Sequence, residues 1–471
     1  MNRVGQKILH TWSSLGPRFL PFADAASADL PLGRLLRLSL FQVSVGMALV
    51  LLVGTLNRVM IVELGVPASM VAIMVSLPVL FAPLRTLIGF KSDNHRSAFG
   101  WRRVPYMWKG SLIQFGGLAI MPFALLVLSG GGESHQWPAW VGHLGAGLAF
   151  LLVGAGVHVT QTAGLALATD LATVEAQPKI VGLMYVSQLF GMVVSALVFG
   201  VLLEDFSPAR LIQVIQGSAV TTVVLNAIAL WKQEGRNRAR SQAPREEPSF
   251  SEAWASFRNA DKAMRRLVSV GLGTMAFGMQ DVLLEPYGGQ ILGLNVASTT
   301  RLTATMAIGG LLGFGLASRV LSRGADPFRM ASAGALVGIP AFFAVILSAP
   351  LNAPMMFGLG AWLIGFGGGL FAHGTLTATM NAAPKEQVGL ALGAWGAVQA
   401  TTAGVAVAFG GVLRDVVAGM ASRHLLSPAM NNPAASYTLV YGIEVLLLLA
   451  TLVAMAPLVR PGVRMTPIEA R

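Results

Sequence analysis

Long apolar runs recur along this chain, and their length constrains the fold more than any other feature. A helix needs about 20 apolar residues to cross the hydrocarbon core of a bilayer. Runs of about this length occur at 38–57, 68–90, 104–129, 140–170, 180–203, 210–231, 267–285, 299–320, 330–349, 353–380, 387–410 and 438–458. Only 11% of the residues are charged, compared with about 25% in a soluble domain. The sequence therefore predicts an all-α polytopic membrane protein with twelve transmembrane helices.

The distribution of basic residues predicts the topology. If the N-terminus lies inside, the inside segments hold 26 Lys and Arg residues and the outside segments hold 5. Because Lys and Arg collect in cytoplasmic loops, we expect both termini in the cytoplasm. The same distribution accounts for the net charge of +12, so nucleic acid is not expected as a partner.

The polar stretch 232–266 divides the apolar runs into two sets of six, and its Arg, Pro and Ser residues are typical of a linker. The halves also echo each other, since FGVLLED (199–205) ends the fifth run and FGGVLRD (409–415) ends the eleventh. We therefore expect the 6+6 arrangement of the major facilitator fold. The expected parts are a cytoplasmic N-terminal segment 1–37, a six-helix bundle 38–231, the linker 232–266, a second bundle 267–458 and a cytoplasmic tail 459–471.

The loop between the second and third runs reads GFKSDNHRSAFGWRR. Its Gly-x-x-x-Asp spacing, followed by Arg and a basic pair, resembles the loop motif of the major facilitator superfamily in a stretched form. The resemblance implies that Asp93 caps the start of the eleventh helix and that an Arg of the motif pairs with Asp170. We interpret the set as a conformational latch between the halves, whereas the alternative is a solvated basic loop. The set is Gly89, Asp93, Arg96, Gly100, Arg102, Arg103 and Asp170.

Longer segments resemble a narrower family. GTLNRVMIVELGVP, SDNHRSAFGWRRVPY, TQTAGLALATDLA and GMQDVLLEPYGGQILG are similar to the PucC family, also called the bacteriochlorophyll delivery family, with its PucC and LhaA branches. The likeness runs from about residue 15 to 458. It implies a protein of the bacterial cytoplasmic, or intracytoplasmic photosynthetic, membrane that is needed for light-harvesting complex assembly. The implied partners are antenna polypeptides, bacteriochlorophyll as cargo, bacteriochlorophyll synthesis enzymes and membrane lipids.

Polar residues inside membrane helices are candidates for function because burying them is costly. The fourth run carries His158, Gln161 and Thr162, and the tenth carries His373 among glycines. A neutral imidazole is a good ligand, so His158 is the candidate axial ligand to a chlorin magnesium. A hydrogen bond from His158 to a neighbouring helix is the alternative. We expect no metal site formed by the protein alone.

The seventh run contains Gln280, Asp281 and Glu285. Asp281 and Glu285 are four residues apart, so on a regular helix they share a face. We expect Pro286, with the glycines that follow it, to break this helix. The two carboxyls are candidates to bind a proton or a cation, or else they shape the broken end of the helix.

The sequence leaves three functions open. The first is an assembly factor that binds bacteriochlorophyll and delivers it to antenna polypeptides. The second is a proton-coupled secondary transporter of a small amphipathic solute, and the third is a scaffold that holds no pigment. Acids are scarce in the apolar runs, with Asp281 as the main exception, which favours pigment handling or scaffolding. The sequence has no phosphate-binding loop, HExxH or Gly-x-Ser-x-Gly motif, so we do not expect an enzyme.

Overall fold

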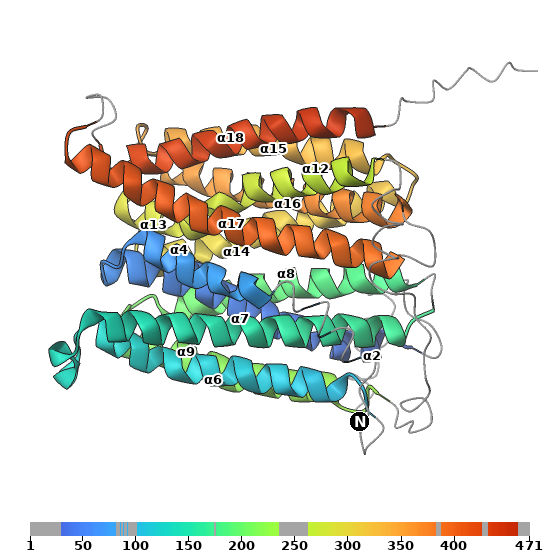
Figure 1. Cartoon of the computed structure of the whole chain (residues 1–471), viewed down its shortest axis with the longest axis horizontal. Coiled ribbons are helices and arrows are strands. Elements are labelled where there is room, and N and C mark those ends of the chain that lie inside the picture. Colours follow the sequence, from blue (N-terminus) through green and yellow to red (C-terminus); the bar gives the residue numbers. More distant parts are fainter. Residues whose placement is uncertain are drawn as a thin grey trace, which may run out of the picture.

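The chain forms a bundle of long helices that lie side by side in the computed structural model (Figure 1). The structure describes residues 30–81, 85, 88, 92, 101–173, 176–234, 262–382, 388–425 and 432–459. Within these ranges the regular elements are all helical. The predicted all-α, multi-pass architecture is therefore confirmed. The expected segments 1–37, 232–266 and 459–471 lie largely outside the described residues.

The first half contains α2 (Leu32–Leu38), α3 (Leu40–Leu49), the π-helical η2 (Val50–Leu56) and η3 (Val59–Glu63), α4 (Ala68–Ser76), η4 (Leu77–Phe81), α6 (Val104–Leu128), η5 (Gly132–Gln136), α7 (Ala139–Asp170), α8 (Gln177–Leu202) and α9 (Pro208–Leu230). The second half contains α12 (Ala263–Gly278), η6 (Met279–Val282), α13 (Leu284–Gln290), α14 (Val296–Leu321), α15 (Pro327–Ser348), α16 (Pro354–Ala382), α17 (Val388–Ser422), α18 (Ala435–Met455) and η9 (Ala456–Leu458).

Eleven helical spans among the described residues are long and apolar enough to cross a membrane. A shorter apolar helix, Ala68–Val79, is the described start of the predicted span 68–90. Beyond Phe81 that span is described only at Arg85 and Ile88.

The bundle has two ends, which we name after buried arginines. The Arg58 end carries residues 64–67, 203–207 and 291–295, and the Arg103 end carries residues 101–103, 171–173 and 231–234. In Figure 1 the Arg103 end lies at the right, beside α2.

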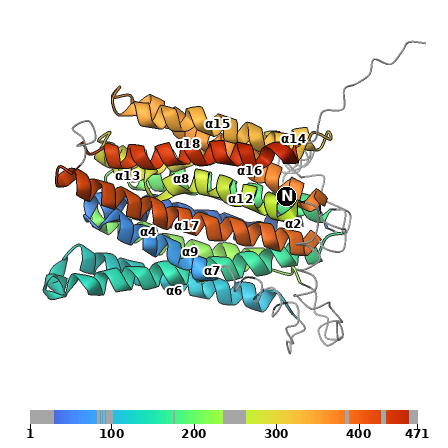
Figure 2. The ribbon, with the colours of Figure 1, turned by 45° about the horizontal axis from the view of Figure 1, so that its top comes forward.

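Glycines let neighbouring helices approach closely, which explains part of the high glycine content. The pair α6 and α7 illustrates this, because a Cβ atom on Gly110 would collide with Thr160, and one on Gly156 would collide with the backbone at Gln114. Figures 1 and 2 both place these two helices side by side.

The halves meet along α4 with α17 and along α8 with α14. On α17, a Cβ atom at Gly404 would collide with Val79, and one at Gly411 would collide with Ala72. Asp415 of α17 also accepts a hydrogen bond at 2.6 Å from the backbone N–H of Ser69, at the start of α4. The two halves are therefore joined closely toward the Arg58 end.

Two predicted helix boundaries are wrong. The eleventh helix was expected to end within 409–415, but α17 continues to Ser422. Arg414 donates to Asp415 at 2.8 Å and to Gln290 at 2.7 Å. Because these charges find partners, they do not end the helix.

The seventh helix was expected to break at Pro286, but the irregular segment is η6, which precedes this proline. Pro286 lies in the first turn of α13. The N–H groups of a first turn have no partner within the helix, so a proline is tolerated there.

Candidate functional site

A network of polar side chains surrounds Arg85 inside the first half. The Arg85 guanidinium donates from Nη2 to Gln161 Oε1 at 3.0 Å and from Nε to Thr162 Oγ1 at 3.2 Å. Gln161 Nε2 in turn donates to Gln188 Oε1 at 2.9 Å and to Gln42 Oε1 at 3.2 Å. Gln161, a predicted cavity residue, is therefore the centre of the network, whereas Arg85 was not among the predicted site residues.

This network lies well within the apolar part of the bundle. Thr162 is eight residues from the end of α7, which corresponds to about 12 Å along the helix. Gln42 is fully buried, and Gln161 is 8% exposed. Polar side chains in such surroundings are retained by hydrogen bonds to one another. The signal that sequence reasoning missed is a lone arginine inside an apolar run.

His158 lies one helical turn from Gln161 and is held by the neighbouring segment η4. Its side chain hydrogen-bonds to the backbone of Pro78. Proline has no backbone N–H, so the imidazole is the donor and the carbonyl the acceptor. Glycine at position 154 makes room for Pro78, since a Cβ atom there would collide with the proline ring. This bond is the cross-helix contact that the sequence gave as the alternative, and Nδ1 is buried with no hydrogen-bond partner among the described residues.

His373 belongs to the second half and is only 7% exposed. Its ring lies 4.3 Å, centroid to centroid, from the ring of Phe314 on α14. The two predicted histidines therefore occupy separate environments in the two halves.

The second half contains a group of buried acceptors around Gln280. Glu444 of α18 is fully buried, and its Oε1 accepts a hydrogen bond at 2.7 Å from the backbone N–H of Gln280. Gln280 Nε2 donates to Asp281 Oδ1 at 2.5 Å. Glu444 Oε2 and Gln280 Oε1 are buried and have no hydrogen-bond partner among the described residues. Glu444 was missed, although it is a single acid within the apolar run 438–458.

Glu285 faces a different neighbour. Thr303 of α14 donates a hydrogen bond to Glu285 Oε1, and a Cβ atom on Gly54 would lie only 2.6 Å from the same oxygen. Glu285 therefore contacts the first half at η2, whereas Asp281 contacts Gln280. The two acids were expected on one face, but η6 between them has three residues per turn and so changes the helical phase.

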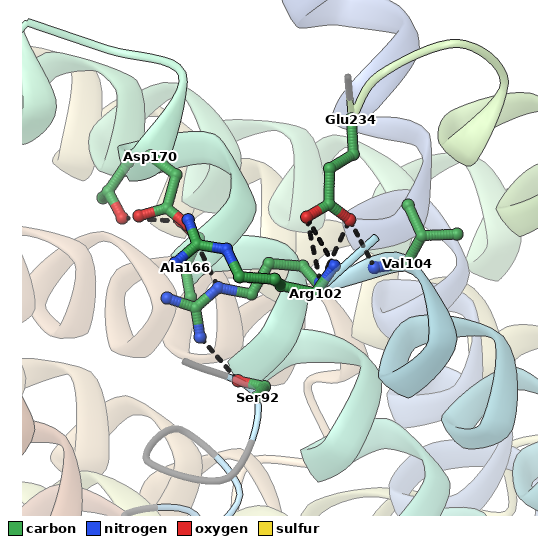
Figure 3. Close-up of polar contacts among 8 residues, drawn as sticks. Ser92, Arg102, Val104, Ala166, Asp170 and Glu234 are labelled. Atoms are coloured by element: carbon green, nitrogen blue, oxygen red, sulfur yellow. Dashed lines mark hydrogen bonds and ion pairs between the residues drawn. The ribbon is translucent and has the colours of Figure 1, made fainter. Parts of the chain in front are cut away.

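The described part of the predicted latch is an arginine–aspartate cluster at the Arg103 end (Figure 3). Arg103 donates from Nε to Asp170 Oδ2 at 3.1 Å and from Nη1 to Ser92 Oγ at 2.5 Å. Arg102 Nη2 lies 4.0 Å from the same carboxylate oxygen. These contacts all lie within the first half. Gly89, Asp93, Arg96 and Gly100, with the expected contact to the eleventh helix, fall outside the described residues.

Glu234 completes this cluster, and sequence reasoning missed it. Its carboxylate accepts hydrogen bonds from the backbone N–H groups of Arg102 at 2.7 Å, Arg103 at 3.0 Å and Val104 at 3.0 Å (Figure 3). The first N–H groups of a helix lack partners and carry positive potential, so a carboxylate stabilises them. Glu234 thereby fixes the start of α6 to the end of α9.

A groove of about 620 Å³ opens between α3, α8 and α9. Its walls are mostly apolar, with Met47, Val194 and Val214 among the lining residues, and Arg210 lies toward the Arg58 end. The predicted pigment residues are in the bundle interior rather than in this groove.

The helix order and the paired halves define a multi-pass membrane protein of the major facilitator type. The solved nucleoside transporter NupG has the same fold, with a TM-score of 0.62 and 16% identity over 89% of this chain and 98% of that structure. A family model described as "PUCC protein" matches residues 55–463. The chain therefore belongs to the PucC family.

Relatives extend over nearly the whole chain. "Protein PucC" of Rhodovulum sulfidophilum is 64% identical over 88% of this chain and 92% of the relative. "Protein PucC" of Cereibacter sphaeroides is 58% identical over 98% of both chains. A more distant relative, the "Bacteriochlorophyll synthase 44.5 kDa chain" of Rhodobacter capsulatus, is 28% identical over 92% of this chain and 97% of its own length.

Proposed function

We propose that this protein is an assembly factor for bacterial light-harvesting complexes, which binds bacteriochlorophyll in the membrane and delivers it to antenna polypeptides. Membership of the PucC family supports this role, and the name of one relative refers to bacteriochlorophyll. The transporter-like fold provides helices around a central interface, and we expect no catalytic step.

The observation that carries the proposal is the hydrogen bonding of His158. Donation to the Pro78 carbonyl orients the imidazole, and in its neutral form one ring nitrogen donates while the other keeps its lone pair. Nδ1 is then the nitrogen with a free lone pair, and it has no hydrogen-bond partner. A chlorin magnesium takes one axial ligand, and a neutral imidazole nitrogen meets that need. His158 would hold the pigment, while the Gln161 network beside it supplies hydrogen bonds to peripheral oxygens.

The proposed location is the bacterial cytoplasmic or intracytoplasmic photosynthetic membrane, with the Arg103 end and both termini in the cytoplasm. The excess of Lys and Arg in the segments assigned to that side supports this orientation. The proposed partners are antenna polypeptides, bacteriochlorophyll synthesis enzymes and membrane lipids. The arginine–aspartate cluster would act as a latch through the loop that contains Asp93.

The test is to purify the protein in mild detergent from a phototrophic host that lacks antenna polypeptides, and to record its absorption spectrum and pigment content. We expect bacteriochlorophyll, or a late precursor, at a fixed ratio to protein. A folded, colourless protein would contradict the pigment-binding role.

Two matched variants on the same helix locate the pigment. His158→Phe is expected to reduce the bound pigment severalfold, because it removes the proposed axial ligand. His143→Phe makes the same replacement near the opposite end of α7 and is expected to leave the pigment ratio unchanged. Equal pigment in both variants would reject His158 as the ligand.

A proton-coupled transporter is the second candidate, and the buried acid Glu444 favours it. No cationic side chain among the described residues pairs with Glu444, and a buried carboxyl of this kind inside a membrane bundle is typical of a proton relay. If a proton moves through this group, Glu444→Gln should abolish antenna formation in cells while the protein still inserts at its normal level. Normal antenna levels in this variant would reject the proton-coupled mechanism.

A further inference from the structure

The guanidinium of Arg85 has more hydrogen-bond donors than the described residues around it accept. It carries five N–H groups, and the structure gives it two acceptors, Gln161 Oε1 and Thr162 Oγ1. Both acceptors are neutral. Among the residues that the structure describes, no carboxylate pairs with Arg85, although its side chain is half-buried between apolar helices.

The amide groups around Arg85 add to this surplus of donors. Because Gln161 directs its oxygen toward Arg85, its Nε2 must face Gln42 and Gln188, and the oxygens of both accept from it. The Nε2 group of Gln42 is then left buried without a hydrogen-bond partner. An unpaired buried donor, and a half-buried cation without a counter-charge among the described residues, both raise the free energy of the folded protein.

Arg103 shows what a structural arginine looks like in this fold. It is 4% exposed, and its charge is compensated by Asp170 at 3.1 Å. Glu234 also satisfies the backbone N–H group of Arg103. Arg85 differs because its partners among the described residues are both neutral, so packing requirements alone do not account for its charge.

We propose that Arg85 is the anion-recognition residue of a ligand site in the first half, and that its ligand carries a carboxylate on an apolar body. The carboxylate would accept two hydrogen bonds from the guanidinium, with Gln42 Nε2 as a further donor. The identification of the apolar body as a chlorin rests on the proposed function. His158 lies within electrostatic reach of Arg85, so one ligand could contact both residues.

If Arg85 recognises a carboxylate, a free acid should bind more tightly than its ester, which has the same ring but no charge. The probes are pyropheophorbide a and its methyl ester, which contain no metal, so their binding does not depend on an axial ligand. Binding to the purified full-length protein is measured in detergent by absorbance and tryptophan quenching. We expect the acid to bind at least about tenfold more tightly than the ester, as charge-assisted hydrogen bonds imply.

Three variants assign this preference to a residue. Arg85→Gln removes the charge and is expected to bring the acid-to-ester ratio close to one, whereas Arg85→Lys keeps the charge and is expected to retain part of the preference. Arg323→Gln removes an exposed arginine at the end of α14 and is expected to leave the ratio unchanged.

Several outcomes would overturn the proposal. They are equal binding of acid and ester to the unaltered protein, a preference that survives Arg85→Gln, and failure of both probes to bind. The proposed function has a separate readout, because pigment that copurifies with the protein and depends on His158 would stand even if the acid were not preferred.

Discussion

The polar network around Gln161 in the first half and the one around Gln280 in the second half differ in character. Around Gln161, donors exceed acceptors among the described residues, because Gln42 Nε2 has no hydrogen-bond partner and the five N–H groups of Arg85 have two neutral acceptors. Around Gln280, the buried atoms without a partner among the described residues are the oxygens Glu444 Oε2 and Gln280 Oε1.

This difference separates two tasks that one fold can perform. A surplus of donors beside a cation suits a ligand with negative charge or carbonyl oxygens. A surplus of acceptors suits a proton or a cation. Similar helical halves therefore do not imply similar chemistry, and the first half is the better place to look for the proposed cargo.

The largest expected effect comes from Gln161→Leu. This change removes the acceptor of Arg85 and the donor to Gln42 and Gln188 together. We expect a loss of about 2–4 kcal/mol of stability, since several buried polar groups lose partners at once. The measurement is thermal unfolding in detergent, followed by tryptophan fluorescence.

Gln280→Leu is the matched change in the second half. The backbone N–H that Glu444 accepts from is retained, so we expect a smaller loss, of about 1 kcal/mol. Equal losses of stability in Gln161→Leu and Gln280→Leu would mean that the two networks contribute equally to stability, contrary to this expectation.

A change of intermediate size tests the contact between the halves. Gly54→Ala adds a Cβ atom 2.6 Å from Glu285 Oε1, and such overpacking costs about 1–3 kcal/mol. The double variant Gly54→Ala with Glu285→Ala removes the closest contact and leaves only Thr303 Oγ1 at 3.1 Å, so it should be more stable than the sum of the single changes predicts. If the change in unfolding temperature of the double variant equals the sum of the changes in the two single variants, then Glu285 does not contact η2.

The smallest effect is expected for Glu444→Gln. The amide oxygen can still accept from the backbone of Gln280, and the new N–H group can face unpaired acceptors nearby. We expect a change within about 1 kcal/mol, measured by the same unfolding assay. A large loss would mean that the carboxyl group of Glu444 is itself needed for folding, and the variant could then no longer report on proton coupling.

Much of the architecture could be predicted from local sequence. Apolar runs of membrane-spanning length predicted the helices, because any such run must satisfy its backbone internally. The same runs, with the resemblance of 54–67 and 278–293, indicated the fold class and the PucC family. The helix ends were less predictable. Arg414 and Asp415 suggested an end, but partners at Gln290 and Ser69, more than a hundred residues away in sequence, keep α17 continuous.

The sequence by itself therefore determined that this is an all-helical, multi-pass member of its family, and it selected Gln161, Thr162, His158 and Gln280 as candidates. Tertiary structure alone decided their partners. It brought Arg85 to Gln161 from a different helix, directed His158 at Pro78 and placed Glu444 beside Gln280. The physical reason is that periodicity and composition depend on neighbours along the chain, whereas the pairing of a buried donor or acceptor depends on which helices pack together.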